Sequence, residues 1–80
     1  MKWIAVSVFD VKLAAFNRPF FAPTLGAAVR SFGDEVVNGE SVMAKHPEDY
    51  VLYQVGAFLD DSGVFEMMSP PHAVSKALIS

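Results

Sequence analysis

Residues 46–68 read HPEDYVLYQVGAFLDDSGVFEMM and predict a β-hairpin. The segment from Tyr50 to Leu59 is rich in Tyr, Val, Leu and Phe, which fit a pleated, half-buried surface. Residues 60–63, DDSG, supply turn-forming side chains and a glycine that can adopt the left-handed conformation. The chain then returns as a second strand. If Leu59 faces Val64 across the turn, both faces of the hairpin are largely apolar, and one helix cannot cover both.

Composition limits the chain to one small domain, spanning residues 1–80. Its 80 residues are 52% hydrophobic and include no cysteine, so neither a disulfide nor a thiolate metal site can stabilise it. A chain of this length buries only about 60% of its extended surface and is marginally stable alone. Oligomerisation is the remaining way to bury more surface.

The charge is unevenly distributed along the chain, although the net charge is −3. Residues 1–30 hold four cations and one acid, whereas residues 31–80 hold two cations and eight acids. Nucleic-acid affinity depends on Lys and Arg that neutralise phosphates, so any phosphate-binding surface must come from the first thirty residues.

The first strand is predicted at Trp3 to Phe9, which is apolar on both faces and therefore central in a sheet. The same start imitates a short signal peptide, but Asp10 and Lys12 interrupt the apolar run, and we expect a buried strand rather than cleavage. No segment reaches the roughly 20 apolar residues needed to span a membrane.

Residues 11–23 are harder to assign. A short turn of helix fits the part from Lys12 to Phe16. Pro19 and Pro23 remove backbone donors, so we expect the rest to be extended or irregular.

The main helix is predicted to begin after Thr24, a good N-cap, and to end near Val37, before Asn38 and Gly39. Apolar residues recur at helical spacing and form one stripe. The stripe consists of Leu25, Ala28, Val29, Phe32 and Val36.

The remaining segments complete the fold prediction. Residues 40–49 form a polar connection with a short helical turn around Ser41 to Ala44. Residues 69–71, SPP, are expected to break the second hairpin strand, leaving residues 72–80 as a short amphipathic helix or docked tail. The order is β-α-β-β plus a C-terminal tail. We therefore predict an α+β fold with a small three-stranded, mostly antiparallel sheet and one main helix.

Aromatic and basic residues near the first two prolines form the candidate nucleic-acid site. Exposed aromatic rings stack on unpaired bases, and nearby cations contact phosphates. The same phenylalanines could instead fill the core or a subunit interface. The candidate residues are Lys12, Phe16, Arg18, Phe20, Phe21 and Arg30.

A second candidate surface lies on the hairpin. Because the small domain has no disulfide and its hairpin is apolar on both faces, we expect a homodimer or higher homo-oligomer. The predicted interface residues are Phe58, Phe65, Met67 and Met68, a flexible, aromatic-containing set. The alternative is that the C-terminal tail covers the second face.

Catalytic chemistry is not predicted. His46, Glu48 and Asp49 lie close in sequence, but a metal needs three or four converging donors and the only other histidine, His72, follows two prolines. We therefore expect a polar loop there, with no metal and no cofactor. No glycine-rich phosphate loop is present, and the two aspartates at residues 60–61 belong to the turn. An enzyme is not expected.

Two stretches, PFFAPT at 19–24 and KHPEDYVLYQVGAFLDDSGVF at 45–65, carry a family resemblance. With a first strand that ends in FD, the chain resembles the small non-structural proteins of gokushovirus-type microviruses, tailless phages with single-stranded DNA genomes. The resemblance covers about residues 3–71. It implies a protein absent from the mature capsid, located in the host cytoplasm, and often described as DNA-binding or as acting in the switch to single-strand synthesis and packaging. It supplies no catalytic residues, and the net acidity departs from what a DNA-binding label leads one to expect.

Two functions therefore remain open. The first is a replication-associated protein that binds single-stranded DNA through residues 16–21 and neighbouring cations. The second is a protein-interaction module that acts on viral or host replication proteins without contacting DNA. Whether Lys12, Arg18 and Arg30 share one surface distinguishes the two.

Overall fold

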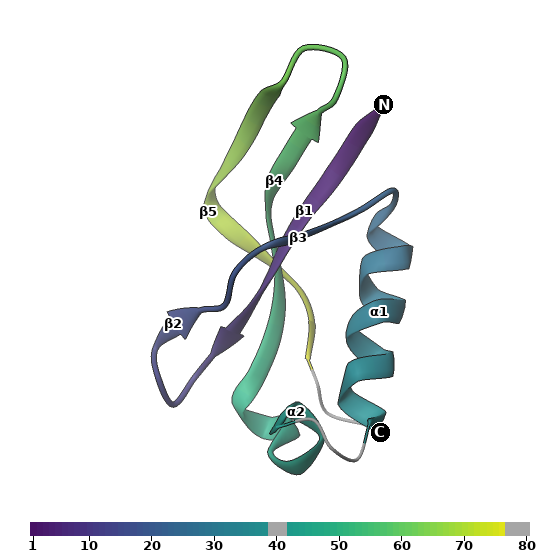
Figure 1. The fold of residues 1–80 in the computed structure, drawn as a ribbon. Coiled ribbons are helices and arrows are strands. Elements are labelled where there is room, and N and C mark those ends of the chain that lie inside the picture. Colours follow the sequence, from purple (N-terminus) through teal and green to yellow (C-terminus); the bar gives the residue numbers. More distant parts are fainter. Residues whose placement is uncertain (39–41, 77–80) are drawn as a thin grey trace.

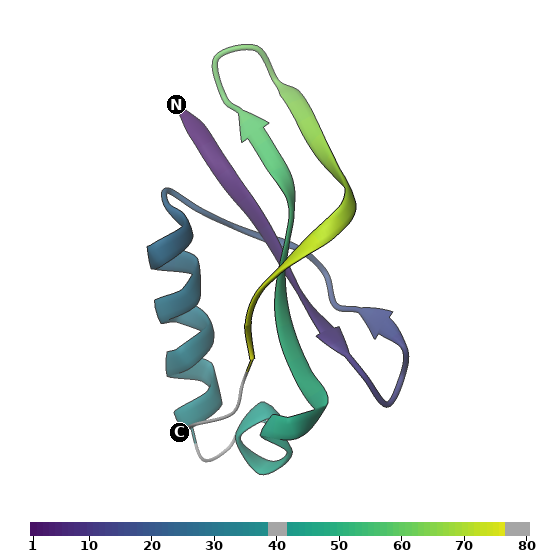
Figure 2. The ribbon, with the colours of Figure 1, turned by 180° about the vertical axis from the view of Figure 1, so that it is seen from behind.

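One long helix packs against an antiparallel sheet in the computed structural model, which describes residues 1–38 and 42–76 (Figure 1). The helix α1 (Leu25–Val37) covers one face of the sheet, and no helix of the described residues lies over the opposite face (Figures 1 and 2). The strands are β1 (Lys2–Asp10), β2 (Ala15–Phe16), β3 (Phe20–Ala22), β4 (Tyr50–Leu59) and β5 (Val64–Lys76). Their order is β2-β1-β4-β5, with β3 also paired to β1.

The β4–β5 hairpin confirms the predicted turn and its register. Leu59 pairs with Val64, and Phe58 pairs with Phe65. Gly63 has φ 73°, the left-handed conformation that its position in the turn requires. Its N–H donates to the carbonyl of Leu59 at 2.8 Å. The turn end of the hairpin projects beyond α1 (Figures 1 and 2), so the helix does not cover it.

Strand β1 is central, as its two apolar faces predicted. It pairs with β4 along its whole length and with β2 and β3 on its other edge. Val6 and Val8 lie in the core beside α1, and the intervening Ser7 is also buried. The Ser7 hydroxyl donates to the carbonyl of Asn17, which ties the β2–β3 connection to β1.

The prediction of a three-stranded sheet was wrong, because β2 and β3 also pair with β1, along the edge that β4 leaves free. Buried backbone N–H and C=O groups need partners, and the chain after the first turn supplies them. Both strands are short because Pro19 lies between them and Pro23 follows them. The expected helical turn from Lys12 to Phe16 is also wrong: residues 11–14 form a turn and β2 follows, with Ala14 at φ 55°.

The predicted end of the second hairpin strand at residues 69–71 is wrong, because β5 continues through Pro70 and Pro71 to Lys76. Its pairing with β4 is nevertheless interrupted there, between Met67 and His72. Strand β5 is at the edge of the sheet, where a residue without an N–H can lie with that side unpaired. The expected helical or docked tail is therefore strand as far as Lys76, and Val74 packs against the core. The tail residues at 77–80 lie outside the described residues.

The helix α1 matches its prediction. The Thr24 hydroxyl accepts from the Ala27 N–H at 3.1 Å and caps the first turn. Of the predicted stripe, Ala28, Phe32 and Val36 are buried and Val29 is half-buried. After α1, the helix α2 (Val42–Lys45) confirms the short helical turn that was predicted around Ser41 to Ala44. Ser41 itself lies outside the described residues. A 3-10 turn (Pro47–Asp49) then leads into β4.

The core lies between α1 and the sheet. It draws its buried residues from β1, β3, α1 and β4, and β5 adds the partly buried Val74. Its buried members are Val6, Val8, Ala22, Ala28, Phe32, Val36, Tyr50 and Leu52.

Gly33→Ala is expected to stabilise the protein. Gly33 is exposed in the middle of α1, and a Cβ at this position meets nothing within 4 Å. Alanine is more favourable than glycine in a helix interior by roughly 0.8–1.0 kcal/mol. Thermal unfolding followed by circular dichroism should show a rise in Tm of about 3–8 °C. An unchanged or lower Tm would contradict the open environment of this residue.

Candidate nucleic-acid interface

The sheet face opposite α1, here called the open face, carries two clusters of aromatic rings. Strand alternation places them there. Val8, Ala22 and Leu52 belong to the core, so their neighbours Phe9 and Tyr53, and also Phe21, lie on the other side. Six phenylalanine and tyrosine rings thus gather on the open face in two groups of three.

The first group, here called the Phe16 cluster, consists of Phe9, Phe16 and Tyr53. The Phe16 ring centroid lies 4.8 Å from that of Phe9 and 5.3 Å from that of Tyr53, and the last two rings are 6.0 Å apart. These tilted and edge-to-face contacts are favourable arrangements for aromatic rings. Phe16 remains 44% exposed, so its outer surface is free to contact a ligand.

The second group, here called the Phe65 cluster, consists of Phe21, Phe58 and Phe65. Phe58 and Phe65 are cross-strand partners with centroids 4.8 Å apart, and Phe21 lies 6.1 and 6.2 Å from them. Phe21 is 46% and Phe65 55% exposed. Phe16 pairs with Phe9 of β1, and Phe21 pairs with Ala5 of the same strand. Because these two β1 residues are four positions apart, Phe16 and Phe21 are separated by roughly 13 Å along the strand.

The structure separates the six residues of the predicted nucleic-acid site. Phe20 is half-buried and packs against the core beside α1, away from the open face. Phe16 and Phe21 belong to different clusters, and Arg30 lies on α1, which covers the opposite face. Phe9 and Tyr53 were missed, because only the pairing of β1 with β4 shows that the two residues share a face.

Lys12 is held in place by the turn that joins β1 to β2. The Asp10 carboxylate is largely buried and accepts from the backbone N–H groups of Lys12 at 3.0 Å and Leu13 at 3.2 Å. This local hydrogen bonding is typical of an aspartate that begins a turn. The turn leads directly into β2, so a cation precedes Phe16 by four residues on a defined backbone.

Arg18 lies at the edge of the sheet and lines a hollow on the side of α1. The hollow has a volume of about 310 Å³, at the lower end of the range for small-molecule sites. Asn17, Arg18, Ser31 and Glu35 supply its polar groups, and Val8, Phe20, Phe32 and Met43 supply its apolar wall. Arg18 therefore shares this hollow with Phe20.

The cations differ in their partners. Lys2 pairs with Glu66 at 3.2 Å, and both side chains are more than half exposed, so this pair contributes little to stability. Lys12, Arg18, Arg30 and Lys45 form no ion pair with another described residue. Their charges are available to phosphate groups.

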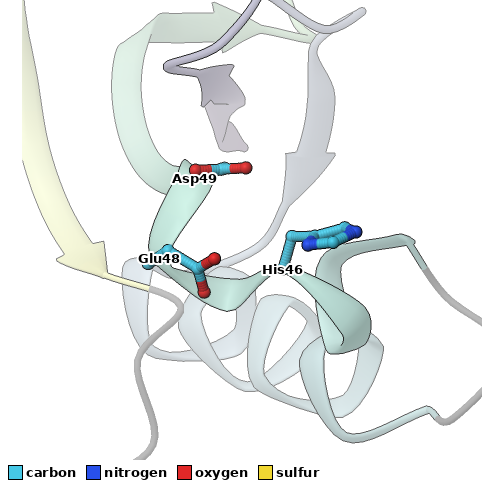
Figure 3. Close-up of side chains that lie close together, drawn as sticks. All are labelled: His46, Glu48 and Asp49. Atoms are coloured by element: carbon cyan, nitrogen blue, oxygen red, sulfur yellow. The ribbon is translucent and has the colours of Figure 1, made fainter.

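Three metal-ligating groups lie together at the 3-10 turn before β4. The donor atoms of His46, Glu48 and Asp49 are within 4.8 Å of one another (Figure 3). His46 and Glu48 are exposed, and Asp49 is half-buried. In the part of the chain that the structure describes, no fourth protein donor joins this group. Water would have to complete the coordination of any bound ion.

Tyr50 is the buried titratable group beside this turn. Burial raises the pKa of its phenol above the ordinary value of 10.0, and the negative charges of Asp10 and Asp49 act in the same direction. Tyr50 also donates a hydrogen bond to the Asp10 side chain, which further favours the protonated phenol.

The raised pKa of Tyr50 predicts a loss of stability in alkali. Above pH 10 the unfolded chain releases this proton while the folded chain keeps it, so the free energy of unfolding falls as the pH rises. Tyr50→Phe lacks the proton and should lose less stability between pH 8 and pH 11. Urea unfolding across this range measures the effect, and parallel curves for the two proteins would contradict it.

The fold and the open face define a small α+β protein with a helix on one side of an antiparallel sheet and exposed aromatic rings on the other. Residues 4–79 match the model of the phage ORF5 protein family. Because the match spans nearly the whole chain, this chain belongs to that family, which confirms the phage origin expected from the resemblance. No curated protein and no solved structure matches the chain. Among the described residues, no helix is both long and apolar enough to cross a membrane.

Proposed function

We propose that this phage protein binds single-stranded DNA on its open face and catalyses no reaction. The carrying observation is Phe16, an exposed ring that rests on Phe9 and Tyr53 in the segment between Lys12 and Arg18. This function fits the resemblance to gokushovirus non-structural proteins, and it would be exerted in the host cytoplasm during replication or the switch to single-strand synthesis.

Stacking supplies the contact to bases. Exposed aromatic rings on an open antiparallel sheet stack on unpaired bases, because every base presents a flat aromatic surface. Such stacking contributes about 1–3 kcal/mol per base and depends little on sequence. Phe9 and Tyr53 support the Phe16 ring from within the sheet, so little side-chain freedom is lost when a base stacks on it.

The cations supply the contact to phosphates. Lys12 lies in the turn that leads into Phe16, whereas Arg18 lies at the sheet edge and lines the hollow beside α1. Neither cation has an ion-pair partner among the described residues. A duplex is a poorer ligand, because its bases are already stacked and α1 carries Arg30 as its single cation, too few for a recognition helix. The net charge of −3 opposes DNA at long range. We therefore expect moderate, salt-sensitive affinity.

Phe16→Leu is expected to weaken single-strand binding about tenfold or more, because the side chain keeps its apolar bulk but loses the flat ring. Phe16→Trp is the matched control and should retain the affinity of the unmodified protein. Fluorescence anisotropy with a labelled oligonucleotide measures both. Contact with two phosphates predicts that affinity falls about sevenfold between 50 and 200 mM salt.

The same titration can overturn the proposal. Absence of single-strand binding, affinity that does not change with salt, or equal binding by Phe16→Leu would each do so. The second candidate, a module that binds viral or host replication proteins without DNA contact, would then stand. One observation favours it. Phe21 and Phe65 of the Phe65 cluster are about half exposed, and Lys2 on the neighbouring strand β1 is paired with Glu66.

A further inference from the structure

The hairpin end of the open face carries an exposed apolar surface, here called the hairpin patch, that the DNA site does not use. It consists of Trp3, Phe21, Phe58, Phe65 and Met67. Trp3 pairs with Phe58 across β1 and β4, and its indole N–H donates to Asp60 at 3.0 Å. Met67 is 72% exposed, and strand alternation places it on the same face as Phe65.

We propose that the hairpin patch is the interface of a two-fold homodimer, in which a second copy of this chain covers it. The inference goes beyond DNA binding and does not depend on it, because the Phe16 cluster lies at the other end of the open face. Of the interface predicted from sequence, Phe58, Phe65 and Met67 belong to the patch. Met68 lies in the stretch between Met67 and His72 that has no partner residue in β4, and it is not part of the patch.

The exposed area is close to what a weak, reversible dimer buries. Phe21 and Phe65 are about half exposed and Met67 more so, and a large aromatic side chain presents about 150–250 Å² when fully exposed. With the half-buried Trp3 and Phe58, the patch offers on the order of 450 Å² per copy. Two copies would bury on the order of 900 Å², close to the roughly 1,000 Å² of a weak biological interface.

The charge distribution favours a second copy over a charged partner. The patch contains no charged side chain, whereas the whole chain has a net charge of −3, so two copies repel least where these surfaces meet. The nearby ion pair of Lys2 and Glu66 lies on the other side of the strands, since Glu66 is between Phe65 and Met67. A neutral surface of flexible and aromatic side chains is self-complementary across a two-fold axis.

The geometry of the hairpin leaves room for a partner. Its turn end projects past α1 (Figures 1 and 2), and every described residue from Asp60 to Pro70 is exposed. A second hairpin can therefore approach the open face without meeting the helix. The two Phe16 clusters would remain outside the interface, one on each copy.

Met67→Glu tests the proposal, because Met67 is 72% exposed and its replacement should leave the fold intact. Light scattering at micromolar concentration should give twice the 8.7 kDa chain mass for the unmodified protein and a single chain mass for Met67→Glu. Leu13→Glu is the matched control, since Leu13 is 73% exposed in the β1–β2 turn, and it should remain a dimer. Circular dichroism verifies that all three proteins are folded.

Three results would overturn the dimer. The unmodified protein could have the mass of one chain at every micromolar concentration, or Met67→Glu could remain a dimer. Larger, open-ended assemblies would show that the contact does not close by a two-fold axis. If Met67→Glu were to lose its circular dichroism signal, Phe65→Ser would replace it as the disrupting variant, with the same mass expected. A patch that instead took up a different protein would leave the unmodified chain monomeric and would also reject the proposal.

Discussion

Gly56→Ala should remove a large part of the stability of the fold. Gly56 pairs with Met67 where the register of β4 and β5 shifts, and a Cβ at this position would lie 2.3 Å from the carbonyl oxygen of Glu66. The obstruction is backbone, which cannot rotate away as a side chain can. Inserting a methyl group into a packed site costs about 1–3 kcal/mol and occasionally more. A small domain without disulfides has only about 3–5 kcal/mol in total.

The expected result is a Tm lowered by about 4–24 °C, or no cooperative transition at all. Thermal unfolding should be measured at one protein concentration, because dimer formation would link stability to concentration. Gly33→Ala is the matched control: the same substitution in open space should raise the Tm. A Gly56→Ala protein as stable as the original would show that β5 does not approach β4 this closely.

Phe32→Ala should produce the second large effect, a loss of about 3–5 kcal/mol in the free energy of unfolding. Phe32 is 3% exposed and is the largest buried side chain that α1 contributes to the core. Its removal leaves a cavity between the helix and the sheet that the smaller Ala28 and Val36 cannot fill. Because stability is of similar size, most chains should be unfolded at 37 °C.

Urea unfolding followed by circular dichroism measures this loss. Val37→Ala is the control on the same helix, since Val37 is 66% exposed and its truncation should change stability by less than about 0.5 kcal/mol. Equal effects of the two substitutions would contradict the assignment of Phe32 to the core. The comparison also tests how far α1, rather than the sheet alone, holds the domain together.

Dimerisation would bear directly on DNA binding. Two copies joined through the hairpin patch would present two Phe16 clusters, and one long strand could contact both. Linked sites bind more tightly than either alone because the second contact forms within the same complex. This gain would partly offset the unfavourable net charge of −3.

Local patterns in the sequence were sufficient for the hairpin and the helix. The bounds of β4, the register of Leu59 with Val64 and the left-handed Gly63 follow from strand propensity and turn chemistry. The start of α1 at Leu25 follows from its N-cap and apolar spacing. These features depend on residues that are close in sequence, so local sequence patterns are enough to predict them.

Only the tertiary structure decided the pairing of the remaining segments. β2 and β3 exist because the free edge of β1 needs hydrogen-bond partners, and β5 passes Pro70 and Pro71 because an edge strand tolerates missing donors. The same long-range pairing places Phe16 against Phe9 and Tyr53, and it places Phe21 in the Phe65 cluster. The sequence by itself therefore determined which residue types were present for stacking and charge contact. Which of them share a surface depended on contacts between residues far apart in the chain, which local propensity does not encode.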